Sequence, residues 1–239
     1  LIKGSIMEQV SKLIDRNLPL NPTLNPNMPA CEIHGTDAMN GMGECVDCQK
    51  SKIEEARNKE RSQWIMSGNW EVPNRFKSAR VADISKPHTI KQGESLFITG
   101  TCGSGKTHYA VAAGKEYLKF DKNITRSNAR FINFQRLAID IKSSFGNSDR
   151  SMSDLIEIAL CDFLVLDDIG CHGTPAPTTI DALYLITNGR YERELPTIYT
   201  TNMSIAEIAK IYGDRIASRL SDCIRIELKD NDRRIKRAA

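Results

Sequence analysis

The sequence has few aromatic residues and no long hydrophobic run. Phe, Trp and Tyr together make up 6% of the 239 residues, and no window approaches the roughly 20 consecutive apolar residues that a membrane-spanning helix needs. The first ten residues also lack the apolar run of a secretory signal. We therefore expect a cytoplasmic protein with no membrane association. At this length the chain can bury a core of one large domain or two modest ones.

The sequence also lacks a strong charge bias. Its 33 Lys and Arg residues against 30 Asp and Glu residues give a net charge of +3, which is too small to indicate a nucleic-acid-binding protein by itself. The chain contains 7 cysteines, an odd number. Because no export signal precedes them, we expect reduced thiols with metal-binding or structural roles rather than disulfides.

Two segments suggest how the chain is divided. Residues 18–30 contain four prolines, which remove backbone donors and indicate a linker or an irregular arm. Residues 51–63 are rich in Lys, Glu, Arg and Ala, a composition typical of a solvated helix that joins two domains. We predict an N-terminal region over residues 1–68 and a second domain over residues 69–239.

The second domain has the pattern of a parallel sheet. Short apolar runs alternate with helical patterns, which is typical of strands joined by crossover helices. Thr178 with Asp181 and Ser204 with Glu207 have the spacing of helix-capping boxes. The predicted strands are 96–99, 130–133, 163–166, 197–200 and 224–228, and the predicted helices lie near 106–120, 134–144, 152–160 and 178–192.

A phosphate-binding loop follows the first of these strands. The segment matches the pattern G-x-x-x-x-G-K-[ST] in the expected order of strand, loop and helix. Its backbone N–H groups and the helix N-terminus would face a phosphate chain, with Lys106 at the β and γ phosphates and the Thr107 hydroxyl on Mg²⁺. The nucleotide-binding positions are Gly100, Thr101, Cys102, Gly103, Ser104, Gly105, Lys106 and Thr107.

Polar residues follow two other predicted strands. Asp167 and Asp168 end the apolar run 163–166, at the edge of a parallel sheet where ligands bind. Asp167 would orient Mg²⁺ and Asp168 would polarise the attacking water. Asn202, after strand 197–200, can hydrogen-bond both a phosphate and a water.

Two arginines occupy one helical face further along the chain. Arg215 and Arg219 are four residues apart, which places them on the same side of a helix. Arginine stabilises the charge that spreads over a phosphoryl group during transfer, and a neighbouring subunit can supply it.

Together these motifs resemble the AAA+ ATPases, and within them the bacterial and phage replicative helicase loaders of the DnaC/DnaI type. Residues 72–79 (VPNRFKSA) also resemble the lead-in to the ATPase domain of that family, as does the DDIG segment at 167–170. The resemblance covers roughly residues 70–237. It implies an α/β fold, an AAA+ P-loop NTPase with a five-stranded parallel sheet. The residues ahead of it, described below, lead us to expect a small zinc-binding N-terminal domain before this ATPase domain.

The resemblance also implies roles for individual residues. Asn202 corresponds to the residue that senses the γ phosphate, and Arg219 to an arginine finger, with Arg215 as its competitor. Arg233 or Arg234, in a terminal basic motif, would lie near the nucleotide. A solvated basic end remains an equal alternative for that tail.

Two pairs of metal-ligand residues lie in the N-terminal region. Cys31 and His34 are separated by two residues, as are Cys45 and Cys48, and ten residues lie between the pairs. Thiolates with one imidazole at this spacing favour a tetrahedral Zn²⁺. Four protein ligands leave no open position, so we expect a structural zinc module at about 31–48. A chance cluster and a redox pair are the alternatives.

The family resemblance implies the partners. An ATP-dependent loader would place the hexameric replicative DNA helicase on single-stranded DNA during replication initiation and would self-associate through its ATPase domain. Lys142, Arg136 and Phe145 are candidates for DNA contact. Residues 7–20, with apolar residues at roughly helical spacing, would dock a partner or pack on the zinc module.

Three alternatives remain open. One is an IstB-like transposition helper ATPase, which the zinc-ligand pairs disfavour. The second is a P-loop nucleoside or metabolite kinase, in which the residues TTN at 200–202 and SRL at 218–220 would have no role. The third is a zinc-dependent adaptor that binds nucleotide as a structural switch, against which Asp168 argues.

Overall fold

The computed structural model describes residues 31–34, 45–84, 87–124, 128–143, 148–170 and 174–229. The chain divides into two compact units, residues 1–60 and 61–239. The boundary falls inside helix α2 (Val46–Ser67), which is longer than the helix predicted over 51–63. None of the helices in the described part of the chain combines the length and hydrophobicity that crossing a bilayer requires.

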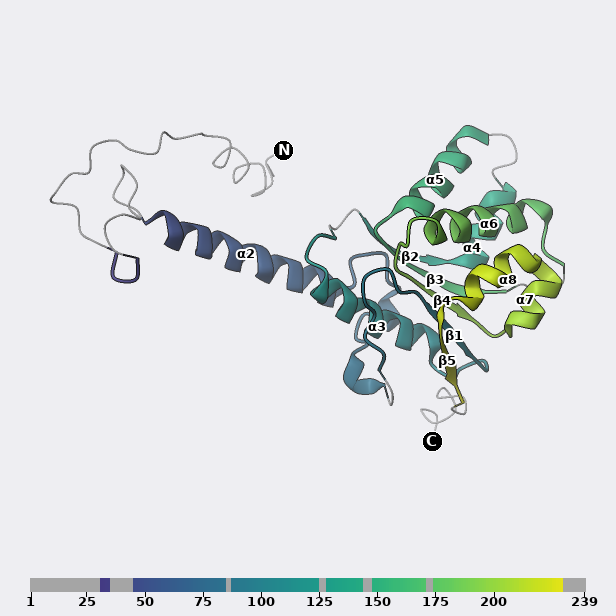
Figure 1. Cartoon of the computed structure of the whole chain (residues 1–239), viewed down its shortest axis with the longest axis horizontal. Coiled ribbons are helices and arrows are strands. Elements are labelled where there is room, and N and C mark those ends of the chain that lie inside the picture. Colours follow the sequence, from purple (N-terminus) through teal and green to yellow (C-terminus); the bar gives the residue numbers. More distant parts are fainter. Residues whose placement is uncertain are drawn as a thin grey trace. The chain divides into compact units, whose positions relative to one another are not determined.

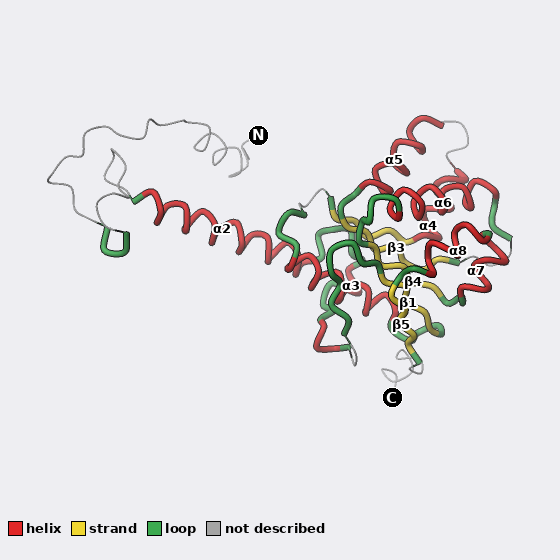
Figure 2. The backbone as a smooth tube through the Cα atoms, in the orientation of Figure 1, coloured by secondary structure: helices red, strands yellow, loops and turns green. Residues whose placement is uncertain are grey.

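The second unit is built on a five-stranded sheet in which every strand pair is parallel (Figures 1 and 2). Its strand order is β2-β3-β4-β1-β5. The α/β class and the five predicted strands are therefore confirmed, with ends shifted by up to three residues. The strands are β1 (Leu96–Gly100), β2 (Ala129–Asn133), β3 (Phe163–Ile169), β4 (Thr197–Thr201) and β5 (Ile224–Leu228).

Helices cover both faces of the sheet, which gives it two separate cores (Figure 1). On one face α3 (Lys106–Phe120) packs on alternate strand residues such as Ile98 and Val165. On the other face five helices pack on Phe97, Leu166 and their neighbours. They are α4 (Phe134–Ser143), α5 (Ser148–Leu160), α6 (Pro177–Tyr191), α7 (Ile205–Tyr212) and α8 (Asp214–Ser221). Because successive strand side chains point to opposite faces, continuous apolar strands supply both cores.

The helices begin largely where the residue pattern predicts. Ser204 caps α7 and forms the predicted box with Glu207. The predicted box of Thr178 and Asp181 is wrong, because α6 begins at Pro177, where the fixed φ of proline suits the first helical position.

Two cations tie the end of α2 and the lead-in segment to α3. The guanidinium of Arg61 donates to the carbonyls of Leu118 and Asp121 at the C-terminal end of α3, where the helix dipole favours a positive charge. Lys115, which is 2% exposed, donates to the carbonyls of Lys77 and Ala79. The segment before the sheet is thus held to the helix that follows the phosphate loop.

Candidate functional site

The phosphate loop connects β1 directly to α3, as predicted. Gly105 precedes the helix with a φ of +98°, a left-handed conformation that glycine adopts without steric strain. At Gly100 a Cβ atom would lie 2.5 Å from the carbonyl oxygen of Leu228 in β5, so this position has no room for a side chain. These glycines therefore let the loop curl at the carboxyl edge of the sheet.

Lys106, the first residue of α3, is buried under this loop. Its ammonium donates to the carbonyls of Gly100 and Thr101, at 2.9 and 2.8 Å. It also donates to the side-chain oxygen of Asn202, which follows β4. The structure therefore brings together the predicted lysine of the loop and the predicted polar residue at the end of a neighbouring strand, 96 residues apart.

Thr107 and Asp167 form the second contact between the loop and the sheet. The Thr107 hydroxyl donates to the two carboxylate oxygens of Asp167 at 3.0 and 3.2 Å. Burial raises the pKa of Asp167, and the hydrogen bonds from Thr200 and Thr107 oppose that shift. A hydroxyl and a carboxylate at this distance are hard oxygen donors of the kind that Mg²⁺ prefers. The predicted pair of magnesium-binding residues therefore fits the ion chemically.

The acidic pair lies in a β-bulge. The register between β3 and β4 shifts between Leu166 and Ile169, which pair with Tyr199 and Thr201. Asp167 and Asp168 therefore face the single residue Thr200, the arrangement that defines a bulge. Asp168 accordingly has a φ of +62°. The bulge therefore places two consecutive acids opposite one residue of the neighbouring strand.

Thr200 holds both acids in this bulge. Its hydroxyl donates to Asp167 Oδ1 at 2.7 Å and accepts from the backbone N–H of Asp168 at 2.8 Å. A third residue, Gln135 of α4, donates from its side-chain amide to Asp168 Oδ2 at 3.0 Å. We did not predict roles for Thr200 and Gln135 from the sequence. Thr200 is the last residue of the predicted strand 197–200, whereas Gln135 lies in the first turn of the helix predicted near 134–144 and follows the strand 130–133 by two residues.

The two arginines of α8 differ in their surroundings. Arg219 donates from Nε to Asn188 Oδ1 at 2.7 Å, and its guanidinium lies 5.3 and 5.7 Å from the ring centroids of Tyr184 and Tyr191. All three partners belong to α6. Arg215 is exposed and contributes its backbone carbonyl to Arg219. Arg219 is thus clamped to its own chain by a hydrogen bond and cation–π contacts.

The remaining predicted site residues are distributed as follows. Arg136 and Lys142 lie on α4 with exposed side chains. Arg233, Arg234, Phe145 and residues 7–20 lie outside the described part of the chain.

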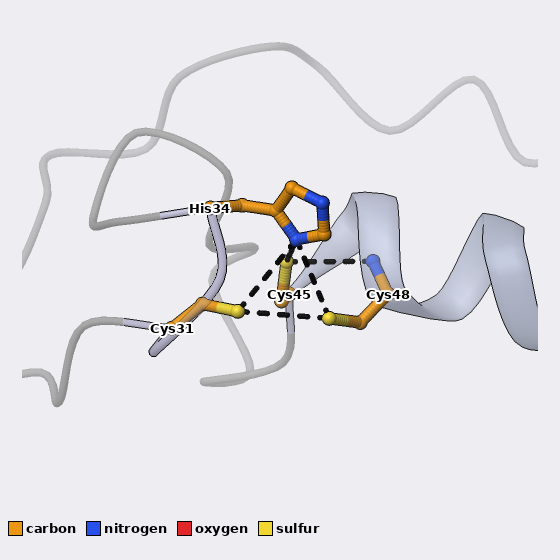
Figure 3. A group of neighbouring side chains, drawn as sticks. All are labelled: Cys31, His34, Cys45 and Cys48. Carbon is orange, nitrogen blue, oxygen red and sulfur yellow. Dashed lines mark hydrogen bonds between the residues drawn. The ribbon is translucent and has the colours of Figure 1, made fainter.

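The four predicted zinc ligands converge in the first unit (Figure 3). Their ligand atoms lie within 4.8 Å of one another. The Sγ atoms of Cys31 and Cys48 are 3.6 Å apart, and those of Cys45 and Cys48 lie 3.4 Å from His34 Nδ1. Zn–S bonds of about 2.3 Å at tetrahedral angles separate two sulfurs by about 3.8 Å. These sulfur–sulfur and sulfur–nitrogen distances are close to the corresponding edges of a zinc tetrahedron.

The electrostatics of this cluster favour a bound cation. The backbone N–H of Ile33, followed by that of His34, lowers the pKa of Cys31 to about 6. Hydrogen bonds from the Cys48 thiol to Cys31 and Cys45, followed by burial and the like charge of these two neighbours, raise the pKa of Cys48 to about 11. A divalent cation reverses this effect and deprotonates its thiol ligands. The donor set thus fits Zn²⁺ both in geometry and in charge.

Comparisons with known proteins agree with this architecture. The family profile described as IstB-like ATP binding protein matches residues 58–237. Over 127 residues the chain is 28% identical to the replicative helicase loader DnaC of Escherichia coli strain K12. That match covers 53% of this chain and 49% of the relative, so the chain spans about half the length of the curated relatives it matches.

Two solved structures have a similar fold. The crystal structure of the DnaC helicase loader superposes with a TM-score of 0.52 and 22% identity, covering 66% of this chain and all of that one. The crystal structure of DnaI superposes with a TM-score of 0.56 and 20% identity, covering 67% of this chain and 96% of the other. The predicted fold of the second unit is thereby confirmed.

Proposed function

Because the chain belongs to the family of IstB-like ATP-binding proteins, we propose that it is an ATPase that loads a replicative DNA helicase onto single-stranded DNA. The main support for this proposal is that residues of the phosphate loop contact residues at the ends of β3 and β4. There Lys106 contacts Asn202, and Thr107 contacts Asp167. The sequence similarity to DnaC supports the helicase-loading role.

The residues of the loop and of β3 would divide the work of ATP hydrolysis. The loop N–H groups and Lys106 would hold the phosphates, and Thr107 with Asp167 would hold Mg²⁺, which neutralises phosphate charge when bound. Asp168 would accept the proton of the attacking water. Gln135 and Thr200 would keep Asp168 oriented for this step, the first through its carboxylate and the second through its backbone.

Other residues would sense and complete the site. Asn202 would hydrogen-bond the γ phosphate once Lys106 turns to the nucleotide. Arg219 of α8, which is held by side chains of α6, would stabilise charge in the site of a neighbouring subunit, and Arg215 is the alternative for this role. Arg233 or Arg234 would approach the nucleotide of their own chain.

The helicase and the DNA would meet different parts of the chain. Single-stranded DNA would contact α4, where the exposed Arg136 and Lys142 supply phosphate-binding charge. Residues 1–68 would hold the hexameric helicase, and the ATPase domain over 69–239 would self-associate. Partner binding and ATP hydrolysis would thus involve separate elements of the chain. The protein would act in the cytoplasm.

We further propose that Cys31, His34, Cys45 and Cys48 bind a structural Zn²⁺. The segment that holds them is too short to build its own apolar core, and a bound metal supplies folding free energy directly. Cys48 lies in the first turn of α2, so the ion would fix the start of that helix against the knuckle formed by Cys31 and His34.

A transposition helper ATPase is the second candidate, favoured by the IstB-like family that the profile describes. Such a protein would bind duplex DNA and a transposase. One experiment distinguishes the two candidates. It compares the ATPase rate in the presence of single-stranded DNA and helicase with the rate in the presence of duplex DNA. A preference for duplex DNA and indifference to the helicase would support the helper.

Site variants test the ATPase proposal. Lys106→Ala should abolish binding of a fluorescent ATP analogue. Asp168→Asn should retain that binding while kcat falls at least about 100-fold, as expected for loss of a general base. Normal turnover in Asp168→Asn would refute its role, and transfer of phosphate to a small acceptor in place of water would refute the loader.

Metal analysis tests the zinc proposal. The protein purified without chelators should contain one equivalent of zinc, and Cys48→Ser should lose it. Cys102→Ser is the matched control, because that exposed thiol lies outside the cluster, and it should keep the full content. Absence of zinc from the purified protein would refute the site.

A further inference from the structure

A groove with a cavity volume of about 450 Å³ lies between α5 and α6. Ile156 and Leu160 of α5 form one wall, and Tyr184, Leu185 and Asn188 of α6 form the other. The two helices pack side by side (Figure 1). The groove is therefore an apolar channel on the side of the domain that carries α4 to α8.

The α5 wall continues as an exposed apolar stripe. Met152, Ile156 and Leu160 follow each other at intervals of four residues and are 49%, 44% and 44% exposed. This spacing places them on one face of the helix. Single exposed apolar residues are ordinary, but a row of them beside an apolar channel marks a surface that binds another molecule.

The ends of the groove carry opposite charges. Asp181 in the first half of α6 and Arg193 just beyond its end both line the channel, twelve residues apart in sequence. A helix has a partial positive charge at its N-terminus and a negative one at its C-terminus. A helix of about three turns therefore matches the groove in length and in charge when it runs from Asp181 toward Arg193.

We propose that this groove binds an amphipathic helix of a partner protein, parallel to α6. An extended peptide would need free backbone groups to pair with, but both walls are helices whose backbone hydrogen bonds are internal. Recognition must therefore come from side chains. A helix with apolar residues at positions i, i+3, i+4 and i+7 presents the stripe that this channel accommodates.

The groove shares two side chains with the clamp on Arg219. Tyr184 and Asn188 line the channel and also hold the Arg219 guanidinium. A bound helix that displaces either side chain would release or reposition this arginine. Helix binding would then change the rate of ATP hydrolysis, an effect that rests on the proposed role of Arg219. Binding of the helix to the groove does not depend on that role.

The test uses a fluorescein-labelled, hydrocarbon-stapled peptide of about fourteen residues with Leu at i, i+3, i+4 and i+7. Fluorescence polarisation without nucleotide should give a Kd in the micromolar range, about −8 kcal/mol. Ile156→Glu should weaken binding at least about tenfold, since it places a charge on the apolar wall. Asp181→Lys should weaken it about threefold or more, because the charge at the helix N-terminus is reversed.

A matched control separates the groove from general hydrophobicity. Phe120→Glu introduces the same charge at an apolar residue that is 70% exposed and lies outside the groove, and it should leave peptide binding unchanged. Equal weakening by both variants, or no binding by the wild-type protein, would overturn the proposal. Self-association in sedimentation velocity that Ile156→Glu abolishes and Phe120→Glu preserves would assign the groove to a second copy and would also overturn it.

Discussion

Thr200→Val removes the hydroxyl that joins the two acids of the β-bulge while keeping the shape of the side chain. Thr200 is 1% exposed, so water cannot replace the lost contacts. Its donation to Asp167 is a hydrogen bond to a carboxylate, worth about 1.5–3 kcal/mol, and the Asp168 N–H would lose its acceptor at about 1–3 kcal/mol. Burial of an apolar group in place of the hydroxyl offsets part of this. We expect a loss of about 2–4 kcal/mol in the free energy of unfolding.

The pH dependence of this loss has a defined sign. Burial raises the pKa of Asp167 in the folded protein, so its contribution to stability is fully present below the ordinary aspartate pKa of about 4. That contribution is lost as pH rises through the folded pKa. Without the Thr200 donor the folded pKa rises further. The deficit of Thr200→Val should therefore be larger at pH 7.5 than at pH 4.5.

Urea unfolding followed by tryptophan fluorescence measures this effect. The only two tryptophans of the chain, Trp64 and Trp70, are buried in the second unit, so the signal reports the domain that contains the bulge. Thr200→Ser is the control, because it keeps the hydroxyl and should retain most of the stability. Equal losses in the Ser and Val variants, or a loss that does not change with pH, would refute the reasoning.

Three further predictions concern other contacts. Gln135→Leu should lower kcat without changing ATP affinity, because Asp168 loses its orienting amide; unchanged kcat would contradict that role. Gly114→Ala should lower the free energy of unfolding, measured in urea, by about 1–2 kcal/mol. The added Cβ would lie 3.0 Å from the Trp70 ring, and the cost of this close contact exceeds the gain in helix propensity from alanine. Arg219→Lys should lower ATP turnover at unchanged ATP affinity, and equal turnover would count against the role in hydrolysis that we propose for Arg219.

The sequence predicted the parts of the site that are contiguous in the chain. The phosphate loop required only local spacing, since its glycines, Lys106 and Thr107 lie within eight residues. The strands were predictable because buried parallel strands are continuous apolar runs. Ser204 and Glu207 were predictable as a cap for the same local reason, whereas Thr178 was wrong because Pro177 set the helix start.

The contacts between strands were not predictable in this way. Whether Asp167 and Asp168 both face Thr200 depends on the register of two strands more than 30 residues apart, and a bulge leaves no mark in the alternation of residues. The contact of Gln135 with Asp168 likewise depends on how α4 packs beside β3.

The sequence by itself determined the glycine-rich loop, the strand set and the two Cys/His pairs, because each depends on residue types at short, fixed spacing. Only the tertiary structure decided that Thr200 joins the acidic pair, that Arg219 is clamped by α6, and that α5 and α6 leave a groove between them. These features arise from packing between elements distant in the chain, and the energy of such packing depends on shape and register that local sequence patterns do not contain.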